Sequence, residues 1–243
     1  MLDNLKDIVQ HTHGLGNIEA VKITGNETET LLNSVAEDRK VILEAKFKKV
    51  IPEFAGTFGM PNLGKLNTIL NIPEYKDGAA ITINTQQDAD GNTVPSGVHF
   101  VNKNGDFKND YRFMSAEVVN EKLKSVKFRG AQWDVDFVPS LAAIQRLRFQ
   151  ASANSEEEYF VAKTENGALK FYFGDPNSHA GNFVFENAVE GNLTKAWSWP
   201  VSAVMSILAL SGDKTFKISD AAVAKITVDS GIAEYSYLIP AKT

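Results

Sequence analysis

Four short stretches of the chain carry apolar residues at the three- and four-residue spacing of a helix with one buried face. Three of these stretches follow a proline, at Pro61, Pro139 and Pro200. Proline suits the start of a helix, because the N–H that it lacks would have no partner there. The apolar positions of the four expected helices are Leu2, Leu5, Ile8 and Val9; Leu63, Leu66, Ile69 and Leu70; Leu141, Ile144 and Leu147; and Val201, Val204, Met205 and Leu208.

The sequence between these helices is β-rich and punctuated by turn signals. Asn104-Gly105 and Asn166-Gly167 predict tight hairpin turns, and the polar stretch 88–97 predicts a turn-rich excursion. The expected strands cover residues 18–24, 29–36, 40–49, 54–58, 79–84, 97–102, 110–115, 131–137, 158–164, 168–174, 182–187, 196–199, 215–219, 222–228 and 234–239.

The order helix, strands, helix, strands occurs twice, which indicates an internal repeat. Residues 115–129 join the two halves, are rich in charge and contain neither Gly nor Pro. We therefore expect an N-terminal domain at 1–117, a connector at 118–129 and a C-terminal domain at 130–243. Val118, Leu123, Val126 and Phe128 are expected to hold the connector against the body. Only Met1-Leu2 precedes the first helix, so the first strand of the N-terminal domain is expected to be reduced or absent.

Composition excludes several classes of protein. The 243 residues are 43% apolar and 23% charged, which is typical of a globular chain. Absence of cysteine excludes disulfides, thiolate nucleophiles and thiolate-held metals, and fits a reducing cytoplasm. No apolar run is long enough to span a bilayer, and the opening residues do not resemble a secretory signal. The formal net charge of −5 argues weakly against nucleic-acid binding, although it says nothing of where charges gather.

No catalytic or cofactor motif stands out. His11 and His13 have no third ligand at suitable spacing, and the stretch after Asp88 lacks the later acidic positions of a calcium loop. The sequence contains no nucleophile elbow, P-loop or dinucleotide fingerprint. We therefore expect no enzyme activity, no metal and no cofactor.

The whole chain resembles the sliding clamps of DNA replication, which include tailed-phage clamps and proliferating cell nuclear antigen (PCNA). The resemblance is strongest in WSWPVSAVMSILALSGDKTFKIS at 197–219, AVAKITV at 222–228 and AEYSYLIPAK at 233–242. It implies an α+β protein of two similar DNA-clamp domains, each with antiparallel sheets outside and two short helices inside. It also implies that three subunits close into a ring, with the helices lining the hole.

The resemblance assigns three sets of residues. A ring that slides needs sequence-independent attraction to phosphate, so cations on the outward helix faces are candidates for DNA contact. These are Lys6, His13, Lys65, Arg146, Arg148 and Lys214. Edge strands at 110–114 and 182–187 are expected to pair between subunits and carry Tyr111, Phe113, Phe183 and Phe185. A groove for partner peptides would involve Val118, Leu123, Val126, Leu238, Ile239 and Pro240, unless these residues close the core of the C-terminal domain.

The expected function is that of a DNA polymerase processivity factor. Its partners would be double-stranded DNA, the polymerase, a clamp loader and two further copies of itself, with no membrane. It would act in the cytoplasm, which is the host's if the chain is phage-encoded. The alternatives are a β-rich structural or assembly protein of a virion and, ranked last, a small-molecule hydrolase. A shell protein has no reason to gather cations on helices of both domains.

Overall fold

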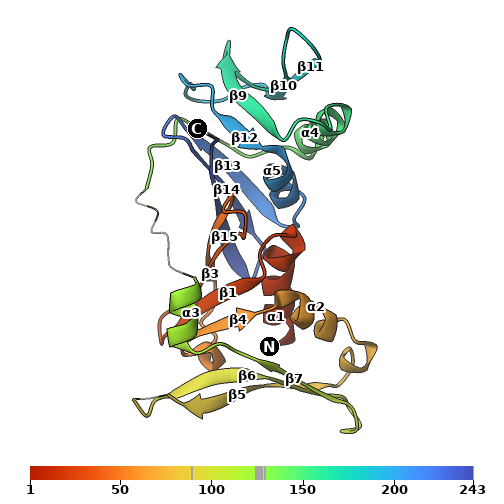
Figure 1. Cartoon of the computed structure of the whole chain (residues 1–243), viewed down its shortest axis with the longest axis vertical. Coiled ribbons are helices and arrows are strands. Elements are labelled where there is room, and N and C mark those ends of the chain that lie inside the picture. The colour runs from red at the N-terminus through yellow and green to blue at the C-terminus, as the bar shows by residue number, and fades with distance from the viewer. Residues whose placement is uncertain (89, 124–127, 129, 243) are drawn as a thin grey trace. The chain divides into compact units, whose positions relative to one another are not determined.

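The computed structural model describes residues 1–88, 90–123, 128 and 130–242, and Figure 1 traces their order through the chain. Two compact units are present: Met1–Val126 with Ser230–Tyr235, and Lys127–Asp229 with Ser236–Thr243. The helices are α1 (Leu2–His11), α2 (Leu63–Leu70), α3 (Ala116–Lys122), α4 (Leu141–Ala153) and α5 (Val201–Leu208). The predicted domain boundaries at 117 and 129 stay a prediction.

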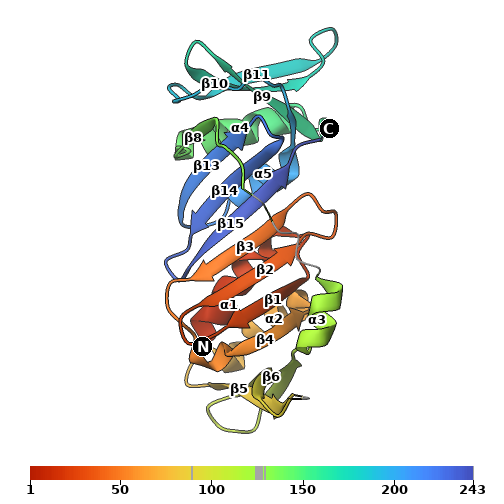
Figure 2. The same ribbon diagram turned by 90° about the vertical axis from the view of Figure 1, so that its left-hand side faces the viewer.

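The first unit holds two groups of antiparallel strands. One runs in the order β4-β1-β2-β3 and the other is the three-stranded sheet β5-β6-β7. Helices α1 and α2 pack on each other behind β1 and β4 in the view of Figure 2. The strands are β1 (Ala20–Gly25), β2 (Thr30–Val35), β3 (Ile42–Phe47), β4 (Gly56–Pro61), β5 (Ala80–Gln87), β6 (Thr93–Val101) and β7 (Lys108–Arg112).

The second unit repeats this plan with one addition. Its four-stranded sheet runs β11-β10-β9-β12, and its other strands are neighbours in the order β15-β14-β13-β8. Strand β8 precedes α4 and pairs with β13, whereas no strand among the described residues pairs with the outer side of β5 in the first unit. The strands are β8 (Val135–Phe137), β9 (Tyr159–Glu165), β10 (Ala168–Gly174), β11 (Ala180–Glu186), β12 (Ser198–Pro200), β13 (Asp213–Ser219), β14 (Val223–Asp229) and β15 (Ala233–Pro240).

The four helices predicted from apolar spacing are confirmed, although Leu2 and Met205 are only half-buried and one predicted inward residue is exposed. Leu63, Leu66, Ile69 and Leu70 are all buried, as predicted. On α4, Ile144 and Leu147 are buried but Leu141 is 85% exposed. Leu141 is the first residue after the Ser140 cap, whose hydroxyl accepts the Ala143 N–H at 3.1 Å. The expectation that Leu141 points inward is therefore wrong.

Two segments differ from their predicted form. Much of the expected excursion at 88–97 is strand, because β6 begins at Thr93 and pairs with β5 through Gln87. The connector contains the unpredicted helix α3, which the Ser115 hydroxyl caps. Val119, not Val118, holds this helix against the body: Val119 is fully buried, whereas Val118 is 48% exposed. Val126 lies outside the described residues.

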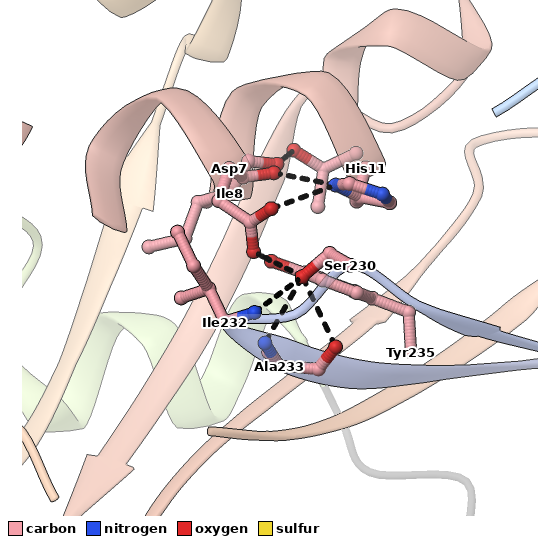
Figure 3. Close-up of polar contacts among 8 residues, drawn as sticks. Asp7, Ile8, His11, Ser230, Ile232, Ala233 and Tyr235 are labelled. Carbon is pink, nitrogen blue, oxygen red and sulfur yellow. Dashed lines mark hydrogen bonds and ion pairs between the residues drawn. The ribbon is translucent and has the colours of Figure 1, made fainter. Parts of the chain in front are cut away.

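A buried polar cluster ties α1 to the segment Ser230–Tyr235 (Figure 3). The Asp7 carboxylate accepts hydrogen bonds from the Ser230 hydroxyl at 3.0 Å and from the Tyr235 hydroxyl at 2.8 Å. His11 Nδ1 lies 3.3 Å from the same carboxylate, and the His11 ring stacks on Tyr235 with centroids 4.4 Å apart. Because Asp7, His11 and Tyr235 are all buried, this cluster satisfies groups that would otherwise destabilise the core.

Candidate nucleic-acid interface

In the first unit, the outward faces of α1 and α2 offer two exposed cations, Lys6 and Lys65. Both helices turn most of their apolar residues inward, and Lys6 and Lys65 lie on the opposite, solvent-exposed faces. Helix α2 begins at Asn62, which has a left-handed backbone and accepts the Lys65 N–H through its side chain at 3.2 Å. This cap fixes the direction in which the first turn of α2, including Lys65, projects from the unit.

A groove of about 320 Å³ lies between these two helices. Its polar walls combine the Lys6 ammonium with neutral amide groups, and the Asn71 amide donates to the carbonyl and side-chain oxygens of Asn67 at 2.8 and 2.9 Å, which leaves the Asn67 amide N–H groups as possible donors to phosphate oxygens. Asn67 and Asn71 belong to this set and were not expected from the sequence, because neutral side chains give no charge signal. The groove is lined by Lys6, Val9, Gln10, His13, Gly14, Asn67, Leu70 and Asn71.

His13 lies beyond the end of α1, in a short 3₁₀ turn (His13–Leu15). Its Nδ1 is 3.0 Å from Glu19 Oε1, and the side chain is 28% exposed. Its ring also lies close to Gly64, where an added Cβ would come within 3.2 Å of the His13 Cε1. His13 is thus held in place by Glu19 and α2, and the carboxylate offsets any positive charge that it would present to DNA.

In the second unit, α4 carries the two arginines expected to face DNA. Arg148 is exposed. The Arg146 guanidinium lies 5.4 Å from the centre of the Phe183 ring on β11, a cation–π contact that holds it beside that strand. Arg148 is therefore the freer of the two.

Lys214 lies in β13 and is half-buried. Its Nζ donates to the Gly212 carbonyl at 2.8 Å, and burial lowers the pKa of its ammonium group. Lys214 is consequently less suited to phosphate contact than Lys6, Lys65 or Arg148.

The two strands expected to join subunits are both edge strands. Strand β7 ends the sheet β5-β6-β7, and β11 ends the sheet β11-β10-β9-β12. Edge strands present backbone N–H and C=O groups that another strand can pair with. The structure thus provides the two edges that the interface prediction requires.

The aromatic side chains on these strands pack within their own units. Tyr111, Phe183 and Phe185 are all buried. Burial raises the pKa of the Tyr111 hydroxyl, which donates to the Pro61 carbonyl. Phe113 is half-buried and stacks on Phe58 with centroids 4.5 Å apart.

Helix α4 also exposes a large aromatic residue that sequence analysis did not single out. Phe149 is 64% exposed, and its neighbour Gln150 donates through Nε2 to the Asn182 carbonyl of β11 at 3.4 Å. The apolar spacing of Ile144 and Leu147 already places Phe149 on the opposite face. An aromatic residue on the polar face of a predicted helix could have indicated, from the sequence, an exposed apolar surface beside the β11 edge.

Comparison of the structure with solved structures decides the fold. One match is PCNA from A. fulgidus, bound to the C-terminal region of FEN-1, with a TM-score of 0.71, 9% identity and coverage of 100% of this chain and 96% of that one. PCNA from Thermococcus kodakaraensis matches with a TM-score of 0.70, 12% identity and coverage of 100% and 97%. The chain has the fold of PCNA.

The PCNA fold confirms the predicted α+β class and the resemblance to sliding clamps at the level of architecture. No family model and no curated protein matches the sequence. The PCNA fold is thus carried by the order of elements and the pattern of burial, because only about a tenth of the aligned residues are identical.

The expected peptide groove is only partly available on this PCNA-like chain. Val118 and Pro240 are exposed and Leu123 is half-buried. Leu238 and Ile239 are 2% and 0% exposed, so they close the core, which is the alternative that strand alternation allowed.

No group of three His, Cys, Asp or Glu side chains among the described residues could hold a metal ion. None of the described helices is long and apolar enough to cross a membrane.

Proposed function

We propose that this protein is a sliding clamp, which closes as a homotrimeric ring around duplex DNA and tethers DNA polymerase. The observation that supports it best is the match to PCNA over the full length of the chain. A match at this identity shows the fold alone, so the proposal also depends on what the surface of this chain offers.

The first supporting feature is the placement of exposed cations. Although the formal net charge is −5, Lys6 and Lys65 lie on the helices of the first unit, and Arg148 lies on α4 of the second. Such cations attract phosphate without reading base edges. This is the attraction that a ring needs if it is to hold DNA and still slide.

The second supporting feature is the pair of open edges. Pairing β7 of one subunit with β11 of the next would satisfy both edges and extend the sheets across the junction. Exposed Phe149 beside β11 would gain an apolar contact at the same junction. A head-to-tail interface of this kind can repeat from subunit to subunit, and the proposal is that three such junctions close the ring.

The partners proposed are the replicative polymerase and a clamp loader, acting in the cytoplasm, in an infected host if the chain is phage-encoded. The matched A. fulgidus PCNA binds the C-terminal region of FEN-1. By analogy, we place the docking of partner tails on the connector of the first unit, at Val118 and Leu123. Val118→Glu should weaken polymerase stimulation, whereas Glu117→Gln, one position away and also exposed, should leave it unchanged.

Topological retention on DNA tests the proposal directly. We expect the protein, loaded on nicked circular DNA, to stay bound in high salt and to be lost when the circle is cut, because a ring slides off a free end. A mass corresponding to three chains should accompany this behaviour. Equal loss from circular and linear DNA would contradict encirclement. A large closed shell in place of a trimer would favour the virion-protein alternative.

A further inference from the structure

Strand β5 leaves open a position that the second unit fills with β8. Both units follow their second helix with three antiparallel strands, β5-β6-β7 in the first and β13-β14-β15 in the second. In the second unit, β8 pairs with the outer side of β13. Among the described residues, no strand pairs with the outer side of β5.

The burial of the two strands differs accordingly. On β13, the inward residues Phe216 and Ile218 are each 1% exposed. On β5, the inward residues Ile81 and Ile83 are only half-buried. Their partners on β6, Phe100 and Val98, are fully buried, so the incomplete burial is confined to the outer strand.

Strand β5 also lacks the usual protection of an edge. Its eight residues, AITINTQQ, contain no charge and no proline, and edge strands of this kind readily pair with another chain. By contrast, β7 carries Lys108, Asp110 and Arg112.

We infer that the outer edge of β5 is a docking site for an extended segment of a partner protein, which adds to the sheet antiparallel to β5, as β8 adds to β13. This inference is independent of DNA encirclement. The repeat also predicts the chemistry of the segment. In β8, Val135 and Phe137 lie opposite Ile218 and Phe216, and Asp136 between them lies opposite Lys217. On β5, a segment of this kind would place its two apolar residues opposite Ile81 and Ile83, and Thr82 stands where β13 has Lys217, so the residue between them is polar but need not be acidic.

The probe for this site is a capped peptide with the sequence of residues 132–139, QWDVDFVP, added to the full-length protein. The protein's own β8 is tethered beside β13, so the free peptide competes poorly there and meets an open edge only at β5. Hydrogen–deuterium exchange should slow across residues 80–87. The exchange rate of the amides that pair with the peptide should fall about tenfold when nine-tenths of the protein has peptide bound, because only the unbound fraction exchanges.

Two controls separate backbone pairing from loose adsorption. The same peptide N-methylated at its three strand residues has no N–H donors there and should give no protection. On the protein, exposed Thr82 lies between Ile81 and Ile83 as Lys217 lies between Phe216 and Ile218. Lys217 Nζ is 2.6 Å from Asp136 Oδ2. Thr82→Lys should therefore tighten peptide binding about twofold and Thr82→Glu should weaken it about twofold, as cross-strand charge pairs do.

Three results would overturn the inference. The first is unchanged exchange at 80–87 with saturating peptide. The second is equal protection by the N-methylated peptide. The third is protection of β5 that rises with protein concentration when no peptide is present, because a second copy of the chain would then be the occupant.

Discussion

The two units repeat one order of elements. They differ at the outer edge of the three strands that follow the second helix. In the second unit, β8 completes this region, and Asp134 at its start accepts the Asp220 N–H at 2.8 Å. In the first unit, no strand among the described residues pairs with β5 in this way. Strands β5 and β13 both alternate inward apolar and outward polar residues. The outer edge of β13 is covered by β8, whereas the outer edge of β5 is open in the part of the chain that the structure describes.

The first helices of the two units differ in a related way. Helix α1 is anchored by the buried cluster around Asp7, which connects it to the segment Ser230–Tyr235. Helix α4 has no buried acid: its buried residues are Ala143, Ile144 and Leu147. The first unit therefore depends on polar contacts where the second depends on apolar packing and the added strand. This difference predicts where each unit is vulnerable.

The largest effect is expected from Asp7→Ala. This change leaves the buried hydroxyl of Tyr235, the hydroxyl of Ser230 and the ring of His11 without the carboxylate that they contact. Removing one member of a buried polar cluster should lower the free energy of unfolding by about 3–5 kcal/mol. Urea denaturation measures the loss. The control Asp3→Ala, on the exposed side of α1, should cost under about 1 kcal/mol. Similar losses for both variants would contradict the assigned role of the cluster.

A matched pair of truncations tests the difference between the two edges. Ile218→Ala removes a side chain that is 1% exposed, and should destabilise the protein by about 3 kcal/mol. Ile83→Ala removes the same atoms from a half-buried position, and should cost about 1 kcal/mol. Thermal and urea unfolding of both variants give the comparison. Equal costs would mean that β5 is already covered as well as β13.

Sequence patterns predicted the helices well because each begins beside a proline or a clear apolar repeat. Pro61, Pro139 and Pro200 mark three of the four helices, and the structure has a helix after each. The prediction for Leu141 was wrong because helical spacing alone does not identify the first residue after a helix cap. The side chain of that residue can point into solvent. Helix α3 was missed because it has only seven residues and one buried side chain, Val119.

The candidate site was less predictable than the fold. Charge identified Lys6, Lys65 and Arg148, which are exposed, but it could not show that Arg146 rests on Phe183. Asn67 and Asn71 are neutral, so charge could not mark them as candidates for DNA contact. Only the structure places them in the groove between α1 and α2. Leu238 and Ile239 follow Tyr237 in three consecutive buried positions, so simple alternation could not tell which of them faces a partner.

Charge reversal on each unit tests whether both contribute to DNA binding. Arg148→Glu and Lys65→Glu should each weaken binding and lower the dependence of log affinity on log salt by about 1 for each phosphate that the side chain no longer neutralises. Fluorescence anisotropy over a salt series measures both quantities. Lys103→Glu, in the turn between β6 and β7, makes the same change of charge away from the helices and should have little effect. If only Arg148→Glu alters the slope, the helices of the first unit do not approach the DNA.

The smallest effect is expected at Asp220, whose backbone N–H donates to Asp134 beside β8 and whose carboxylate holds the residues that lead into β12. Asp220 accepts the backbone N–H groups of Thr194 and Lys195 at 2.9 and 3.1 Å. Burial alone would raise the pKa of Asp220, but these bonds together with the Thr194 hydroxyl lower it below the ordinary value. A carboxyl whose pKa is lower in the folded protein stabilises it above the unfolded pKa of about 4, and the contribution is lost as pH falls through the folded pKa.

Asp220→Asn should therefore lower the free energy of unfolding by no more than about 1 kcal/mol at pH 7, because the site is partly exposed to solvent. The difference from the unmodified protein should begin to shrink as pH falls below about 4, and should approach zero once pH is below the lowered pKa of the folded carboxyl, which is then protonated as well. Urea denaturation at pH 7 and at successively lower pH follows this convergence. A difference that stays constant over this range would mean that the negative charge of Asp220 adds nothing to the stability of the folded protein, and that its hydrogen bonds to Thr194 and Lys195 depend on the shape of the side chain alone.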